Sequence, residues 1–198
     1  MLFRSPHLAL RDGQWRTIFG WQDLWRHPFP GIGPRWMANC DVPDLAVFPA
    51  RHADLATVRF SAGVELTLMH LGLWAMSWLV RARLLPRPEA LARPLLAVKR
   101  RLSGFGSDAG GMFVTMEGSD HDARPLRLVW HVIARSNHGP FIPPAPAALL
   151  AAPLARGAVA DRGARPCLGL VPLADIEALL TPLDIAFTLS EVADNVVV

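Results

Sequence analysis

Few residues of this sequence have the types and spacing of a catalytic site. The chain contains no G-x-S-x-G turn, no H-E-x-x-H pair, no C-x-x-C pair and no P-loop. These motifs mark common hydrolases, zinc enzymes and nucleotide-binding proteins. His121 lies between Asp120 and Asp122, but three neighbours on one turn point in different directions, which favours a solvated loop over a metal site. We therefore expect no metal ligands in this chain.

Two glycine-rich stretches invite comparison with dinucleotide-binding loops. Such a loop follows a strand and opens a helix. Residues 104–111 instead leave an expected helix and lead into an expected strand, and the stretch Gly31-Ile32-Gly33 has Trp36 where the third glycine belongs. Both stretches predict turns. We therefore expect no cofactor-binding residue and no binding of NAD or NADP by this chain alone.

Four polar residues remain as candidates for holding a small polar metabolite, because they lie at expected turns or on the polar face of an expected helix. They are Asp41, Arg59, His70 and Asp108. A second interpretation of Asp41 is a helix N-cap, a position that aspartate favours, with Asp44 in the first turn of the same helix. A second interpretation of His70 is a hydrogen-bonded structural histidine.

The most apolar segment, residues 64–80, predicts a helix rather than a membrane span. It is shorter than the roughly 20 apolar residues that a span requires. Polar residues also interrupt it, and at helical spacing several fall with small residues on one stripe: Gly63, Thr67, His70, Trp74 and Ser77. The rest of the circumference is apolar, which predicts a helix buried nearly all round with one polar seam.

A long hairpin forms the centre of the expected scaffold. Residues 112–117 and 126–134 alternate at period two around a polar hinge, which is typical of two paired strands. Asp12-Gly13 predicts a second hairpin over residues 8–19, whereas residues 20–34, rich in Trp, Pro and Gly, predict an irregular packed segment. Further strands are expected at 57–60, 167–171 and 187–192, and helices after Asp41, from Pro88 with a break at Pro94, over 145–156 and over 173–180. Together these predict one α+β domain over residues 1–198, with a mixed, largely antiparallel sheet and helices packed on one face.

Composition limits the classes of binding partner and the cellular location that we expect for this chain. The chain has 198 residues, is 52% apolar and carries a net charge of +3. Its basic residues are scattered, and only Lys99-Arg100-Arg101 forms a run, without interleaved aromatic residues, so we expect no nucleic-acid partner. The cysteines Cys40 and Cys167 lie far apart, and no secretory leader opens the chain, so a cytoplasmic protein without a transmembrane span is expected.

The central hairpin also predicts self-association. Its nominal outer face carries Phe113, Val129 and Ile133. A monomer would leave this apolar area in water, whereas a two-fold contact covers it. We therefore expect a homodimer that forms through this face of the sheet.

Several stretches resemble the C-terminal part of saccharopine dehydrogenase-like oxidoreductases, and together they cover nearly the whole chain. Most of their residues are glycine, proline and apolar core types, which identify an architecture better than a reaction. The stretches are Cys40-Asp41-Val42-Pro43-Asp44, Leu71-Gly72-Leu73-Trp74, Phe105-Gly106-Ser107-Asp108-Ala109-Gly110-Gly111-Met112, His138-Gly139-Pro140-Phe141-Ile142-Pro143 and Gly163-Ala164-Arg165-Pro166-Cys167-Leu168-Gly169-Leu170.

The resemblance implies a two-domain dehydrogenase in which an N-terminal Rossmann domain holds NAD or NADP. The domain seen here would supply a cleft wall for a small-molecule substrate and an oligomer interface. The Rossmann domain is absent from this chain, so the chain alone is expected to lack hydride-transfer activity, and no catalytic residue can be carried over. The alternative is a non-catalytic protein- or membrane-surface-interaction module that uses the tryptophan-rich residues 20–34 and the helix at 64–80.

Overall fold

The computed structural model of the chain describes residues 6–85, 87–159, 163–164 and 166–192. The first five residues, Arg165 of the resemblance motif and the C-terminal tail lie outside the described residues. Contacts along the chain separate two compact units, whereas the sequence indicated one domain. Unit 1 comprises Met1–Pro28 and Gly33–Ser107, and unit 2 comprises Phe29–Ile32 and Asp108–Val198.

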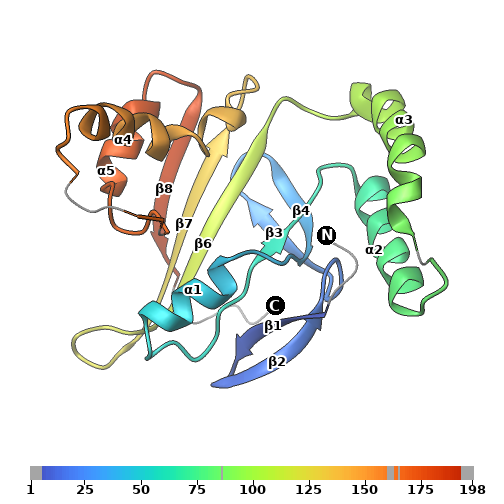
Figure 1. Cartoon of the computed structure of the whole chain (residues 1–198), viewed down its shortest axis with the longest axis horizontal. Helices are drawn as coiled ribbons and strands as arrows, with labels where there is room; N and C mark the ends of the chain where they lie inside the picture. Colours follow the sequence, from blue (N-terminus) through green and yellow to red (C-terminus); the bar gives the residue numbers. More distant parts are fainter. Residues whose placement is uncertain (1–5, 86, 160–162, 165, 193–198) are drawn as a thin grey trace. The chain divides into compact units, whose positions relative to one another are not determined.

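Unit 1 begins with the predicted hairpin, formed by strands β1 (Pro6–Arg11) and β2 (Gln14–Phe19) (Figure 1). Asp12 and Gly13 form its turn with φ of 52° and 73°. A two-residue turn of this type needs positive φ at both central positions, which Asp-Gly tolerates. The hairpin prediction is confirmed.

The second sheet of unit 1 was not predicted. Strands β3 (Trp25–Phe29), β4 (Gly33–Asn39) and β5 (Ser61–Ala62) form it in the order β3-β4-β5. The expectation of an irregular segment at 20–34 is therefore wrong, because β3 is an edge strand and an edge tolerates Pro28. The expected strand at 57–60 is also wrong, since the ladder to β4 begins only at Ser61.

The helices of unit 1 follow the predicted order. They are α1 (Asp44–Arg51), α2 (Thr67–Arg81), the 3-10 turn η1 (Pro88–Leu91), α3 (Ala92–Leu102) and the 3-10 turn η2 (Ser103–Phe105). The expected break at Pro94 is wrong, because α3 runs from Ala92 through Pro94 to Leu102; the change from η1 to α3 comes earlier and leaves Pro94 in the first turn, where proline is tolerated. Asp44 lies in the first turn of α1 as expected, but Pro43 occupies the N-cap position and no side chain caps the helix. The N-cap interpretation of Asp41 is therefore wrong.

Helix α2 buries its polar side, whereas the apolar residues around it predicted that the apolar side would be buried. Its buried residues are His70, Met76 and Ser77, so the polar seam itself faces the protein. Leu68 is 72% exposed and Leu79 is 47% exposed. The expectation of burial nearly all round is wrong: the apolar side is largely exposed, while His70 and Ser77 occupy the buried side, where His70 Nδ1 accepts from Val64 N and the Ser77 hydroxyl donates to Trp74 O.

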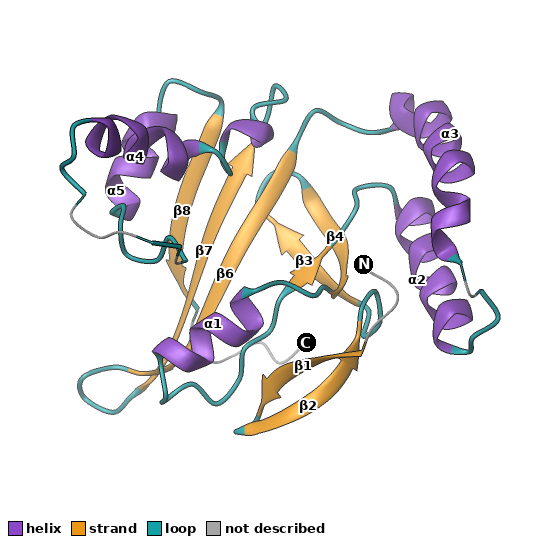
Figure 2. Cartoon of the chain, viewed as in Figure 1, coloured by secondary structure: helices purple, strands orange, loops and turns teal. Residues whose placement is uncertain are grey.

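Unit 2 is built on the central hairpin. Strands β6 (Gly110–Ser119), β7 (Pro125–Ala134) and β8 (Ile185–Glu191) form an antiparallel sheet with β7 in the middle (Figure 2). The 3-10 turn η3 (Gly139–Phe141) and helices α4 (Ala145–Ala155) and α5 (Leu173–Leu180) lie between β7 and β8 in the chain. These elements confirm the sequence prediction, except that residues 167–171 form no strand, because Gly169 adopts a φ of 68° that breaks an extended run.

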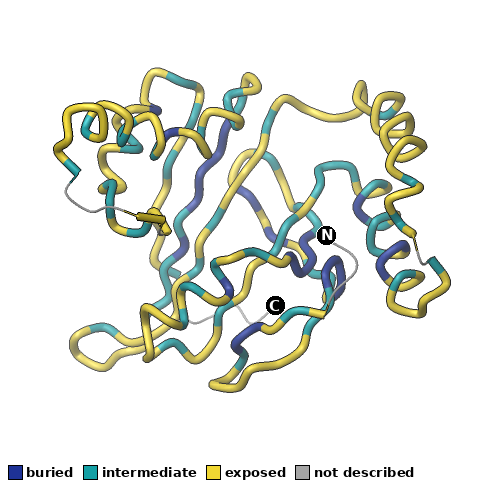
Figure 3. Tube along the Cα trace, in the orientation of Figure 1, coloured by how far each residue is buried: buried dark blue, intermediate teal, exposed yellow. Residues whose placement is uncertain are grey.

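The face of this sheet that was predicted to be exposed is buried, and much of the face that was predicted to be buried is exposed. Val129 and Ile133, expected on the outer face, are only 7% and 3% exposed. Phe29 packs against Phe113 on that face with ring centroids 5.6 Å apart. Met112, Val114 and Met116 on the other face are 43%, 44% and 51% exposed, and β7 is the most continuously buried strand (Figure 3).

The fold class is α+β, with three small antiparallel sheets and five α-helices in the described part of the chain. The expected single mixed sheet with helices on one face is therefore wrong. The long β6–β7 hairpin gave the strongest period-two signal, and the sequence offered no sign that shorter strands would pair separately. Within the described ranges, no helix is both long enough and apolar enough to cross a membrane.

Candidate anion-binding site

A strained turn in unit 1 supports the candidate site. Trp21 and Asp23, between β2 and β3, adopt left-handed φ values of 60° and 56°, which are uncommon for non-glycine residues, above all a bulky one. Two backbone hydrogen bonds fix the turn to the end of β4: Trp21 N donates to Asn39 O at 2.8 Å, and Asn39 N donates to Gln22 O at 3.0 Å. The turn is therefore held by tertiary contacts rather than by local preference.

The Asn39 side chain connects three segments beneath this turn. Asn39 is only 1% exposed. Its Nδ2 donates to Asp23 Oδ2 at 2.5 Å and to Phe19 O at 3.5 Å, while its Oδ1 accepts from Arg11 Nη2 at 3.4 Å. A buried amide that uses both its donor and acceptor groups fixes the positions of its partners. Asn39 thus places the Asp23 carboxylate and the Arg11 guanidinium next to each other.

Arg59, one of the predicted site residues, extends over the same region. Its Cζ lies 4.8 Å from the centroid of the Trp25 ring, and its Nη2 donates to the backbone O of Asp23 at 3.4 Å. Burial lowers the pKa of Arg59, and the positive charge of Arg11 lowers this pKa further, while Asp23 opposes both effects. Two guanidinium groups therefore lie close enough to repel each other across a partly dehydrated surface.

In the described ranges neither guanidinium forms an ion pair, and the charge of Asp23 offsets the repulsion at Arg59 only in part, because the pKa of Arg59 is still lowered. Within the same ranges, Arg11 Nε is buried without a hydrogen-bond partner. Asp23 directs a carboxylate oxygen to Asn39. Free guanidinium donors beside an aromatic ring are suited to a carboxylate or phosphate, which accepts two parallel N–H groups. We name Arg11, Asp23, Trp25, Asn39 and Arg59 the arginine site.

His70 packs against the strained turn that carries Asp23 of the arginine site. Its side chain is fully buried, and its ring packs edge-on against Trp21 of the strained turn, with centroids 5.3 Å apart. His70 Nδ1 accepts a hydrogen bond from Val64 N at 3.4 Å, and burial lowers the pKa of the ring, so the imidazole is neutral at pH 7. In this arrangement His70 contacts the turn and not a ligand surface.

Asp41 and Asp108 are not members of the arginine site. Asp41 is exposed and borders an open hollow of about 460 Å³ in unit 1, whose other lining residues are His7, Leu8, Trp15, Val42, Leu45 and Ala46. The mainly apolar lining offers few groups that would orient a polar ligand. Asp108 belongs to unit 2, where it is exposed and its backbone O accepts from Asn137 N at 3.1 Å.

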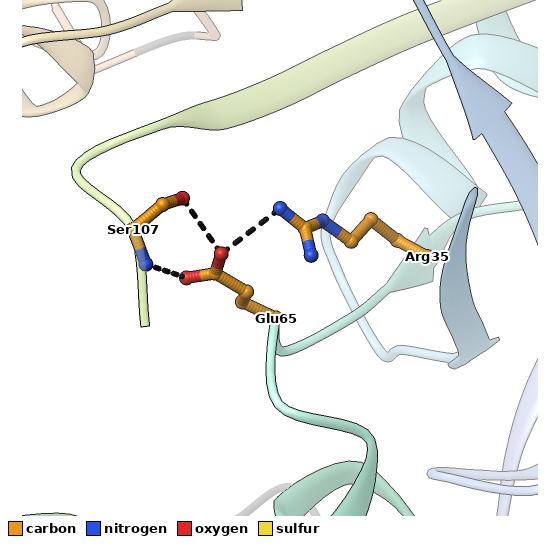
Figure 4. Close-up of polar contacts among 3 residues, drawn as sticks. All are labelled: Arg35, Glu65 and Ser107. Atoms are coloured by element: carbon orange, nitrogen blue, oxygen red, sulfur yellow. Dashed lines mark hydrogen bonds and ion pairs between the residues drawn. The ribbon is translucent and has the colours of Figure 1, made fainter. Parts of the chain in front are cut away.

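The glycine-rich stretch at 104–111 is held by a carboxylate. Glu65 Oε1 accepts hydrogen bonds from Arg35 Nη2 at 3.0 Å and from the Ser107 hydroxyl at 2.6 Å, and its Oε2 accepts from Ser107 N at 2.9 Å (Figure 4). Burial acts to raise the pKa of Glu65, but the hydrogen bonds from Ser107 and the charge of Arg35 outweigh it and lower that pKa. The ionised carboxylate therefore fixes the turn that precedes unit 2, a structural role for residues that the sequence suggested only as a turn.

Sequence reasoning found one member of the arginine site and missed four. Arg59 was identified because it lies beside an expected turn, and the Asp12-Gly13 turn located Arg11 at a strand end without indicating where its side chain points. No periodic signal marks Asn39 as buried, and the left-handed conformation of Asp23 depends on contacts with β4. Comparison of the sequence with protein-family models and with curated proteins finds no match.

Proposed function

We propose that this chain is the C-terminal substrate-binding and oligomerisation domain of a saccharopine dehydrogenase-like oxidoreductase. In that protein a Rossmann domain would hold NAD or NADP, and this chain would hold an anionic small-molecule substrate at the arginine site. The resemblance motifs support the family. The observation that supports the binding role is the pair of guanidinium groups, Arg11 and Arg59, that repel each other and form no ion pair in the described residues, with Asp23 offsetting the repulsion only in part.

The chemistry of the site favours a carboxylate or a phosphate as the bound group. An anion between the two guanidinium groups would remove their mutual repulsion and use their free donors. The Arg59 guanidinium lies over the ring of Trp25. This contact restricts the side chain before an anion binds, so less conformational entropy is lost on binding. Asp23 limits the net positive charge, which favours a small anion over an extended polyanion.

Replacing Arg59 with alanine is expected to weaken anion binding at least about tenfold, because a hydrogen bond to a charged group contributes about 1.5 to 3 kcal/mol. Glutarate and inorganic phosphate serve as probes in isothermal titration with the unmodified chain. Arg59→Lys keeps the charge but lacks the planar fork, so it should restore only part of the affinity.

Arg26→Ala is the matched control for Arg59→Ala. Arg26 also stacks on a tryptophan of unit 1, with its Cζ 5.2 Å from the Trp36 centroid, but it belongs to no arginine pair. Its loss should leave the titration unchanged. Equal weakening by both variants, or no saturable binding of either probe, would show that the arginine site is not the binding site. The family assignment has its own test, since it requires a strand, a G-x-G-x-x-G turn and a helix encoded upstream in the same reading frame.

The oligomerisation role is proposed for the partly exposed face of the β6–β7–β8 sheet, on which the β6 residues are exposed although Val132 of β7 is only 1% exposed. The strand register sets Met112, Val114 and Met116 opposite Val132, Trp130 and Leu128 on one apolar face. Leu189 on β8 faces Trp130 and is 63% exposed. A two-fold contact would cover this face twice with the same residues.

Val114→Glu is expected to convert a dimer to a monomer without unfolding the chain, because Val114 is 44% exposed at the centre of this face. Light scattering across a concentration series would measure the change. Thr188→Glu is the control, since the register places Thr188 opposite the buried His131, on the other face of the sheet. An unmodified chain that stays monomeric throughout the series would refute the dimer.

A further inference from the structure

The outward face of helix α2 lacks the polar residues that a solvent-facing helix normally carries. Leu68, Gly72, Ala75 and Leu79 recur at intervals of four, three and four residues, and all four are exposed. Trp78 borders this stripe and is 46% exposed. A charged or polar outer face is the usual arrangement on a surface helix. The stripe is therefore a surface that water alone solvates poorly.

Helix α3 is amphipathic but is not packed into a core. Leu91, Leu95, Val98 and Leu102 repeat at the same four, three and four spacing, while Arg93 and Arg100 lie on the opposite side. Every residue from Ala92 to Arg101 is exposed, and α3 is coloured as exposed along its length in Figure 3. Leu95 and Val98 on the apolar stripe are 39% and 47% exposed. In the described part of unit 1, the apolar side of this helix is therefore left largely uncovered.

The same segment carries an excess of positive charge. Residues 81–101 contain one acidic residue, Glu89, and seven basic ones, whereas the whole chain has a net charge of only +3. The rest of the chain is therefore net negative. Among the described residues, none of the basic residues between positions 83 and 101 forms an ion pair. The basic residues are Arg81, Arg83, Arg87, Arg93, Lys99, Arg100 and Arg101.

We propose that residues 67–102, here called the helical arm, dock on the surface of an anionic lipid bilayer. The apolar residues of α2 and α3 would enter the boundary between headgroups and acyl chains, and Trp78 would lie at headgroup depth. Arginine and lysine side chains would extend to the lipid phosphates. A basic helix with one apolar side is the form of a helix that lies in the membrane interface.

Charge complementarity favours a bilayer over a second copy of the chain. Two helical arms in a homodimer would bring the same excess of positive charge together, which opposes association. An anionic leaflet attracts that charge and also accepts the exposed leucines. The helical arm contains no residue of the arginine site, so lipid docking and anion binding are separate properties that separate measurements detect.

The test is sedimentation of the full chain with lipid vesicles. Vesicles of phosphatidylcholine alone are compared with vesicles of phosphatidylcholine and phosphatidylglycerol, at low and high salt. Binding to the anionic vesicles should be at least about tenfold weaker for Arg93→Glu with Arg100→Glu, because each basic residue near the surface contributes roughly a fivefold factor. Leu68→Gln with Leu79→Gln should weaken it by about tenfold or more through lost apolar burial.

Arg51→Glu with Arg156→Glu is the matched control, because both residues are exposed, lie outside the helical arm and change the net charge equally. Its binding should stay within about twofold of the unmodified chain. Failure to bind anionic vesicles, equal binding to neutral vesicles, or equal loss in the control would overturn the proposal. A different result would identify a second copy of the chain as the partner of the helical arm. In that case the unmodified chain would self-associate without binding vesicles, and Leu68→Gln with Leu79→Gln would abolish the self-association. The lipid and salt dependence of the unmodified chain tests the proposal even where a variant fails to fold.

Discussion

Replacing Asn39 with leucine is expected to lower the free energy of unfolding by about 3 kcal/mol. The substitution keeps the number and branching of the side-chain heavy atoms, although leucine is larger, and it removes both hydrogen-bonding groups. Asp23 then loses the 2.5 Å hydrogen bond from Nδ2, and Arg11 loses its acceptor at Oδ1. Because Asn39 is only 1% exposed, water cannot replace the lost partners without opening the turn.

Urea unfolding followed by tryptophan fluorescence measures this loss, since Trp21 and Trp25 lie in or beside the affected turn. Gln14→Leu is the control, because Gln14 is an exposed amide on β2, and its replacement should change stability by less than about 0.5 kcal/mol. The Asn39 variant should also lose the anion binding proposed for Arg59, since the turn that carries Asp23 is released. An Asn39 variant as stable as the Gln14 variant would mean that this network contributes little to the fold.

The parts of the fold that local sequence patterns determine were predictable. The period-two runs of β6 and β7 and the Asp12-Gly13 turn depend on neighbouring residues alone. Strand β5 has only two residues, too few to show any period. Strand β3 contains Pro28, which lowers strand propensity, and its pairing depends on β4.

Burial was harder to predict than secondary structure, because alternation defines two faces without showing which one is covered. In the β6–β7 hairpin the choice is made by Phe29, which is more than 80 positions earlier in the chain than Phe113. In α2 the polar side of the helix is buried, since His70 and Ser77 each pair with a nearby backbone group. Hydrophobicity alone predicts the reverse orientation.

The arginine site could not be predicted from the sequence without knowing the conformation of the turn at Trp21 and Asp23. Arg11, Asn39 and Arg59 are separated by 20 residues or more. Arg11 contacts Asn39 directly, and Asp23 of the left-handed turn contacts both Asn39 and Arg59. A single sequence contains no signal for such convergence, because these φ values depend on the hydrogen bonds to β4.

Replacing Gly63 with alanine is expected to destabilise the chain by about 2 to 3 kcal/mol, the usual range for forcing extra volume into a packed site. A Cβ at this position would overlap the backbone O of Trp36 and would lie 3.0 Å from Met37 Sδ. The carbonyl oxygen belongs to β4 and cannot rotate away as a flexible side chain would. The strand would have to move, and Val64, which donates to His70, would move with it.

Gly72→Ala supplies the matched comparison on the neighbouring helix. A Cβ at Gly72 meets no heavy atom within 4 Å, and alanine is favoured over glycine inside a helix by about 0.8 to 1 kcal/mol. Thermal unfolding should therefore give a lower Tm for the Gly63 variant and an equal or higher Tm for the Gly72 variant. The same chemical change would then have opposite effects at two positions nine residues apart. If the Gly63 variant unfolds at the temperature of the unmodified chain, the close approach of residue 63 to β4 is not a constraint on the fold, and the placement of α2 beneath the strained turn must have another cause.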